Sequence, residues 1–159
     1  MANILTPAEV RAIVTPNVRF DVGYYSTNIE YAQQLFLKPI MCEAFYNDFV
    51  AQIGALPVLY QLLNDTYIKY IVAYGSALVS YKKDLTPQTD NQGVMTNSTQ
   101  YTKQADPQLI KGSLMQLADM LTNYRIDFAT YLLENPNDFP LFDSDTSVLS
   151  LELRDFIKY

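Results

Sequence analysis

The feature that most constrains the fold is a long amphipathic segment in the C-terminal third of the chain. Asp106 and Pro107 supply a helix cap followed by proline at the first helical position. Asn135 and Pro136 then end the segment. Between them, apolar residues recur at alternating four- and three-residue steps, close to the period of helices packed side by side: Ile110, Leu114, Leu117, Leu121, Tyr124, Phe128 and Tyr131. A helix over 107–134 would be about 40 Å long, which is long for a chain of this size.

A second capped helix is predicted near the N-terminus. Thr6, Pro7 and Glu9 combine a hydroxyl cap, a proline at the first helical position and a glutamate placed to reach back to the cap. We expect this helix to end at about Val14. The alternation that follows over residues 18–22 predicts either a short strand or an extended linker.

The middle of the chain has helical apolar spacing interrupted by turn residues, which predicts several shorter helices. The predicted boundaries are Ser26 or Thr27 as a cap, Lys38-Pro39 as an interruption, Gly54 as a stop, Pro57 as a restart, Asn64-Asp65 as a break with a new helix from Thr66, and Lys83 as the last end.

Four tyrosines on the helix that follows Thr66 also fall at helical spacing: Tyr67, Tyr70, Tyr74 and Tyr81. We interpret them as the edge of the core, because tyrosine buries a large ring and keeps a polar tip. The alternative is a dedicated binding face.

A polar stretch from Thr86 to Gln108 separates the two best helices, and residues 86–106 of it form the expected insert. Loops this long inside a compact domain are usually functional or disordered. A hairpin around Asn97-Ser98 is one possibility, and a mobile surface loop is the other. As a docking element, the insert would contact a partner through Val94, Met95, Asn97, Thr99 and Tyr101.

The last residues, 143–159, read as a C-terminal tail. Leu149, Leu151 and Leu153 alternate with polar residues, and Phe156 follows. The tail could add to a partner as a strand or coil back as a helix turn, and these four residues are its candidate contacts. The predicted fold is therefore all-α: a bundle of about five helices in one domain, residues 1–142, with a long polar insert before the last helix and an extended tail.

Composition excludes several classes of function. The chain has no histidine, which removes histidine-based acid-base chemistry and His-ligated zinc. The only cysteine, Cys42, lies among apolar residues and is expected to be a small buried hydrophobe. A net charge of -6 opposes nonspecific binding to nucleic acid or anionic lipid. No segment approaches about 18 apolar residues, so we expect a soluble, unexported protein.

No constellation of residues supports catalysis, so we expect the chain not to be an enzyme and to need neither cofactor nor metal. Asp143 and Asp145 form the nearest carboxylate pair outside the helices, but a solvated turn explains them better, since no calcium-loop spacing follows. Gly93 and Lys103 do not form a phosphate-binding loop.

Four segments carry a wider likeness: LTPAEVRAIV, YSTNIEYAQQLFLKPIMCEAFYNDFV, NQGVMTNSTQY and YRIDFATYLLENPNDFPLF. Together they resemble head-tail connector proteins of tailed bacteriophages, closest to the adaptor-like proteins of phages that infect gut Bacteroidetes, including crAss-like phages. The likeness covers roughly residues 4–142. The Thr/Asn-rich insert and the high tyrosine content depart from many connectors.

The resemblance implies a structural virion protein that forms a ring in the phage neck, typically a dodecamer, joining the portal protein to the tail. Its partners would be copies of itself, the portal protein and other neck or tail rings. DNA would pass through the channel without specific binding, and no membrane would be involved. The resemblance also implies that the insert lies against neighbours and that the tail reaches an adjacent subunit or ring.

Two other functions remain open from the residues alone. One is a small helical binding module, an inhibitor or antirepressor, with the insert as its contact surface. The other is a cofactor-free enzyme that uses carboxylates and tyrosine.

Overall fold

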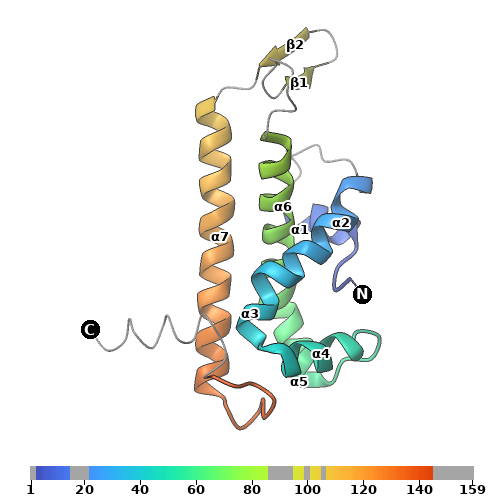
Figure 1. Ribbon diagram of the computed structural model, residues 1–159, viewed down its shortest axis with the longest axis vertical. Helices are drawn as coiled ribbons and strands as arrows, with labels where there is room; N and C mark the ends of the chain where they lie inside the picture. The colour runs from blue at the N-terminus through green and yellow to red at the C-terminus, as the bar shows by residue number, and fades with distance from the viewer. Residues whose placement is uncertain (1–2, 15–21, 86–94, 99–100, 105–106, 145–159) are drawn as a thin grey trace, which may run out of the picture.

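The computed structural model describes residues 3–14, 22–85, 95–98, 101–104 and 107–144 (Figure 1). These residues are mostly helical, which confirms the all-α prediction at that level. Five continuous helical runs are present in the described residues, and one two-stranded hairpin lies before the last of them.

Helix α1, Pro7–Ile13, begins at the predicted cap. The Thr6 amide donates to Glu9 Oε2 at 2.7 Å, and the Glu9 amide donates to Thr6 Oγ1 at 3.3 Å, so the capping box is confirmed. Val10 and Val14 are buried and attach the helix to the core. The predicted strand or linker over 18–22 lies outside the described residues except for Val22, which begins the next helix.

The second run joins α2, Val22–Ala32, to the π-helical turn η1, Gln33–Leu37, and to α3, Lys38–Met41. The cap predicted at Ser26 or Thr27 is wrong, because α2 starts at Val22 and both residues lie inside it.

The interruption predicted at Lys38-Pro39 is also wrong. Pro39 occupies the first turn of α3 directly after the π-helical turn, where a proline is tolerated because its missing N–H has least need of a helical partner. The helix ends three residues later at Cys42, whose backbone has a positive φ of 61°.

After Cys42, α4, Glu43–Ala51, leads through a turn to α5, Val58–Leu63. The stop predicted at Gly54 agrees with this turn, and Pro57 caps α5. The break predicted at Asn64-Asp65 is wrong: η2, Asn64–Ile68, carries α5 directly into α6, Lys69–Leu85. The wider i→i+5 turn keeps Leu63 and Ile68 on the same buried side, so burial outweighs the local turn preference of Asn and Asp.

Strands β1, Met95–Ser98, and β2, Tyr101–Gln104, pair antiparallel beyond the ends of α6 and α7 (Figure 1). Ser98 pairs with Tyr101 and Asn97 with Thr102. Asn97 and Ser98 are therefore both paired within strand β1 and do not form the turn. The connection between the strands comes after Ser98, two residues later than the turn expected at Asn97-Ser98.

Helix α7, Pro107–Glu134, matches the predicted long helix, and Asn135 begins the turn that ends it. The side chain of Asn135 donates to the Tyr131 carbonyl oxygen at 2.8 Å. Phe139 is 2% exposed and anchors the segment that follows.

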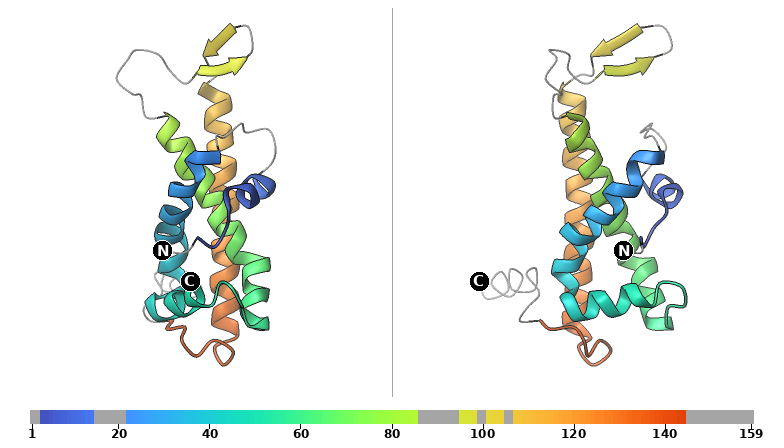
Figure 2. Two further views of the ribbon diagram at one scale, coloured as in Figure 1. Left: turned by 90° about the vertical axis from the view of Figure 1, so that its right-hand side faces the viewer. Right: turned by 45° about the vertical axis from the view of Figure 1, so that its right-hand side comes forward.

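Helix α6 is the central element, with α1, α2 and α7 packed around it (Figure 2). In the buried contact with α2, Asn28 Nδ2 donates to Ser80 Oγ at 2.7 Å. Gly75 lets the ring of Phe36 approach α6 closely, because a Cβ at this position would lie 2.6 Å from Phe36 Cδ2. Along α7, the side chains of Leu117, Leu121 and Phe128 in the predicted seam are buried in the core.

Candidate interaction surfaces

The hairpin carries three of the predicted contact residues. Met95 and Asn97 lie on β1, and Tyr101 lies on β2, so the pairing of the strands brings them to one end of the molecule. The other predicted contacts lie outside the described residues: Val94, Thr99, Leu149, Leu151, Leu153 and Phe156. Figure 1 shows the hairpin at the opposite end of α6 and α7 from α4 and α5.

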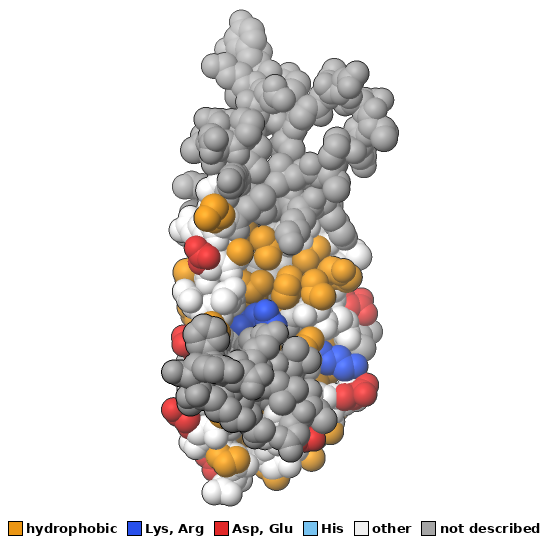
Figure 3. All heavy atoms as spheres, turned by 60° about the vertical axis from the view of Figure 1, so that its left-hand side comes forward, with side chains coloured by type: hydrophobic (Ala, Val, Ile, Leu, Met, Phe, Trp, Pro, Cys, Tyr) orange, Lys and Arg blue, Asp and Glu red, His pale blue; other side chains and the backbone are white. Residues whose placement is uncertain are grey.

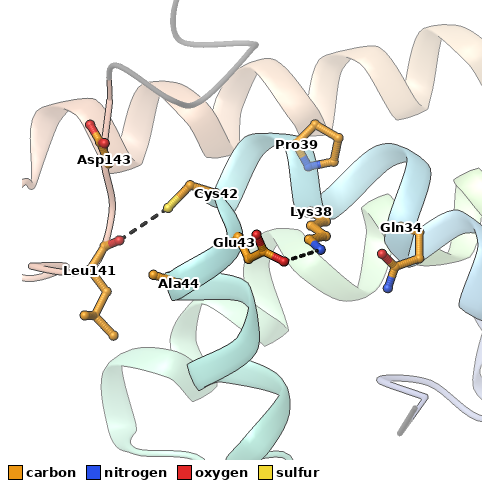
Figure 4. A pocket seen from close by; sticks show the side chains of 8 residues that line it. All are labelled: Gln34, Lys38, Pro39, Cys42, Glu43, Ala44, Leu141 and Asp143. Atoms are coloured by element: carbon orange, nitrogen blue, oxygen red, sulfur yellow. Dashed lines mark hydrogen bonds and ion pairs between the residues drawn. The ribbon is translucent and has the colours of Figure 1, made fainter.

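A cavity of about 550 Å³ lies between the α3–α4 junction and the segment that follows α7 (Figure 4). Both charge signs are present in its lining, together with apolar side chains. The lining residues are Gln34, Lys38, Pro39, Cys42, Glu43, Ala44, Leu141 and Asp143.

Two interactions shape this cavity. Lys38 Nζ lies 3.0 Å from Glu43 Oε1, and the Glu43 side chain is 75% exposed, so this ion pair contributes little stability. The Cys42 thiol donates to the Leu141 carbonyl oxygen at 3.3 Å. This bond connects the sharp α3–α4 junction to the chain that leaves α7 (Figure 4).

The prediction that Cys42 is a small buried hydrophobe is confirmed, because it is 8% exposed. Its positive φ and its bond to Leu141 could not be read from the residue type. Asp143 is exposed at the cavity rim, whereas Asp145, its predicted partner, lies outside the described residues. In the described part of the chain, no three His, Cys, Asp or Glu residues gather as a metal site would require.

Five of the tyrosines form a seam between α7 and the continuous run of η2 and α6. Tyr70 and Tyr124 stack with ring centroids 4.7 Å apart, and the Tyr74 and Tyr124 rings also stack, with centroids 5.8 Å apart. Tyr67 contacts Tyr131 at 5.6 Å. Partial burial is the largest cause that raises the pKa of Tyr67, Tyr74 and Tyr124 above the usual value. The seam packs against the core, which confirms the interpretation of Tyr67 and Tyr74 as core edge; the Tyr81 side chain is outside the described set.

Tyr60 on α5 binds Asp48 on α4. Its hydroxyl donates to Asp48 Oδ2 at 2.6 Å. Burial first, and then this hydrogen bond and the Asp48 charge, raise the pKa of Tyr60 from 10.0 to about 12. Gln52 donates to the same carboxylate oxygen at 2.8 Å, so Asp48 accepts two hydrogen bonds that hold the α4–α5 corner together.

Large apolar side chains that the sequence did not single out are exposed on several of the described elements. On α5, Val58 is 83% exposed, Leu62 49% and Leu59 42%, and their spacing puts them on one face of the helix. On the other elements, Tyr31, Leu35 and Met115 are about half exposed. The sequence feature that could have revealed the exposed face of α5 is its high apolar content. The six-residue helix buries only Leu63, so it has more apolar residues than the core contact needs.

The described helices include none that combines the length and the apolar character required to cross a membrane. Comparison of the chain with protein-family models, curated proteins and solved structures finds no match.

Proposed function

We propose that this chain is the subunit of a ring in the neck of a tailed bacteriophage, joining portal to tail around the DNA channel. The observation that carries the proposal is the exposed apolar face of α5, formed by Val58, Leu59 and Leu62. Apolar side chains that gather on an exposed face are a common feature of protein contact sites. The resemblance of residues 4–142 to connector proteins supports a ring as the form of this assembly.

Two further features support a structural role. The hairpin and the α5 face lie at opposite ends of the α6–α7 column, which gives the subunit separate surfaces for different neighbours (Figure 1). The net charge of -6 suits a channel wall that does not retain DNA phosphates. In this proposal, the partners are other copies in a dodecamer, the portal protein and adjacent neck or tail rings, and the protein resides in the virion.

The second candidate is a small helical binding module, an inhibitor or antirepressor, which would use the same α5 face or the hairpin. The two proposals differ in the mass of the purified protein. A ring predicts a particle about twelve times the 18.1 kDa subunit, formed by the chain alone or with portal protein present. A species that stays monomeric by light scattering, even with portal protein, favours the binding module.

The α5 face can be tested within that experiment by two neighbouring substitutions. Leu62→Glu introduces a charge on the apolar face, whereas Gln61→Glu introduces the same charge at an exposed position next to it. We expect L62E to yield a folded monomer and Q61E to form the ring. Rings of unchanged mass with L62E would show that this face is not the subunit contact.

A further inference from the structure

The tyrosine seam is a partly exposed strip along one side of the molecule. Its members are half-buried and lie on two elements, the η2–α6 run and α7: Tyr67, Tyr70, Tyr74, Tyr124 and Tyr131. The ring contacts between these two elements place the tyrosines together on one flank. None of the five hydroxyls forms a hydrogen bond with another residue in the described part of the chain, so the phenol oxygens can interact with an outside donor.

Two exposed carboxylates border this strip on α7. Asp127 lies three residues after Tyr124, and Glu134 lies three residues after Tyr131. These four positions span only about 80° around the helix axis, so they share one flank. Burial is the largest cause that raises the pKa of Tyr67, and the charges of Asp127 and Glu134 add to it, which places both carboxylates near this ring. Neither carboxylate forms an ion pair with another described side chain.

The chain already places one cation against the seam. Lys69 Nζ lies 5.5 Å from the centroid of the Tyr70 ring, within the range of a cation–π contact. The same Nζ lies 3.2 Å from Asp65 Oδ1, so its charge is offset within the chain. A ring of the seam therefore accepts a positive group, and Asp127 and Glu134 leave a surplus of negative charge beside the strip.

These features together select the chemistry of a ligand. Exposed carboxylates repel phosphate groups, so the strip does not fit nucleic acid or a lipid headgroup. A guanidinium group fits it, because it can pair with a carboxylate, donate to phenol oxygens and stack on an aromatic ring. Lysine offers the charge but lacks the planar fork of donors.

The charge of the whole chain favours the same kind of partner. Figure 3 shows acidic side chains at several places in the described part of one face, in agreement with the net charge of -6. This charge attracts a basic segment toward the molecule. In the described part of the chain, the positive side chains lie singly on separate elements, and two of them are already in ion pairs: Arg11, Lys38, Lys69 and Arg125. These elements of a second copy would offer single cations, so a different protein is the better source of a basic segment.

We propose that the tyrosine seam, together with Asp127 and Glu134, is a docking surface for an arginine-bearing segment of a partner protein. The guanidinium group of the partner pairs with these carboxylates and stacks on the exposed parts of the tyrosine rings. The surface is separate from the α5 face and does not depend on ring formation. It can therefore be tested on the subunit whether or not the proposed function holds.

Fluorescence anisotropy of labelled peptides with the full chain tests the chemistry of the ligand. The probes are three peptides in which glycine alternates with arginine, with lysine or with citrulline, which keeps a planar group but has no charge. We expect the arginine peptide to bind about threefold more tightly than the lysine peptide, and the citrulline peptide not to bind. Equal affinities for the arginine and lysine peptides, or for the arginine and citrulline peptides, would overturn the proposal.

A matched pair of charge substitutions tests the position of the site. Asp127→Asn removes a carboxylate beside the seam, whereas Asp119→Asn removes one at an exposed position on another flank of α7, about 140° around the helix from Tyr124. We expect D127N to weaken binding of the arginine peptide about threefold to fivefold and D119N to leave it nearly unchanged. An equal effect of the two variants would mean nonspecific attraction to an acidic protein and would overturn the proposal.

Substitutions of Tyr70 test the contribution of the rings, with circular dichroism as the check on folding. Tyr70→Phe keeps the aromatic face and should bind the arginine peptide within about twofold of the wild type, whereas Tyr70→Leu should weaken binding about threefold. Binding by Y70L that equals the wild type would contradict a role for the seam. Self-association of the subunit that the arginine peptide reverses would assign the surface to a second copy and would overturn the choice of a different protein.

Discussion

At the scale of single residues, Cys42 has the most unusual conformation in the described chain. Its φ of 61° with ψ of 168° is a region that glycine occupies and other residues rarely enter. The strain, about 1–3 kcal/mol, is held by its surroundings: the Tyr46 amide bonds the Cys42 carbonyl oxygen at 3.1 Å, and the thiol bonds Leu141. The sharp turn separates α3 from α4 and forms the wall of the cavity.

Removing the side chain at this position in two ways isolates the strain. Cys42→Gly and Cys42→Ala both lose the thiol, but only glycine adopts this backbone freely. We expect the glycine variant to be more stable than the alanine variant by about 1 kcal/mol in urea unfolding. Ala44→Gly, at an exposed position within α4, is the control. It should lower the free energy of unfolding by about 0.5–1 kcal/mol, because alanine is normally more stable than glycine in a helix. If the alanine form is more stable than the glycine form at position 42 as well, the backbone of Cys42 is not strained.

Tyr60 predicts a pH dependence with a definite sign. Its pKa is raised to about 12 in the fold, so the neutral phenol is the form that the fold favours. Its contribution to stability is therefore complete below pH 10 and decreases as the pH rises from about 10 to about 12, where the unfolded chain ionises first.

The measurement is the difference in unfolding free energy between the wild type and Tyr60→Phe across that range. We expect the difference to shrink toward zero by about pH 12, because the other tyrosines cancel in the comparison. Tyr31→Phe, at an exposed position on α2, is the control and should show little change. A difference that is constant up to pH 12 would argue against the Asp48 bond.

At the scale of elements, the organising feature is that α6 supports three other helices. Close packing on so many sides requires small residues, and Ala73, Ala77, Ser76 and Ser80 are all buried on it. The hydroxyls of Ser76 and Ser80 donate to carbonyl oxygens one turn earlier, at 2.6 and 2.8 Å, so their burial leaves neither donor unsatisfied. The small side chains therefore bring α2 and α7 near the α6 backbone.

Two helical glycines should respond to alanine with opposite signs. A Cβ at Gly75 would lie 2.6 Å from Phe36 Cδ2 and 3.3 Å from Ala32 Cβ, so in Gly75→Ala the Phe36 ring must shift and Ala32 must give way slightly. We expect a loss of roughly 1–2 kcal/mol after the gain in helix propensity. Gly112→Ala, on α7, meets open space and should gain about 1 kcal/mol. Chemical denaturation measures both, and equal effects would rule out close packing at Gly75.

At the scale of the whole molecule, the hairpin is separate from the core. The helices bury their apolar residues without it, and a two-stranded ribbon is marginal alone. We expect deletion of Gln92–Thr102 to leave a helical subunit whose thermal midpoint is nearly unchanged but which no longer assembles with its neighbours. Circular dichroism and light scattering test the two halves of this expectation. If the deletion variant still assembles normally, the insert is only a surface loop with no role in assembly.

The sequence by itself determined where the regular helices begin and end when the signals are local. The capping box at Thr6 and the end of the long helix before Asn135 both depend on neighbouring residues, whose preferences act within one or two turns.

Only the tertiary structure decided the rest, because burial against distant segments overrides those local preferences. It carried the helix through Asn64-Asp65 in a π-helical turn and past Pro39 directly after another such turn, and the break came at Cys42. It also decided which apolar residues remain exposed. A surplus of apolar residues in α5 is visible in the sequence, but which side of a short helix meets the core depends on elements far away along the chain.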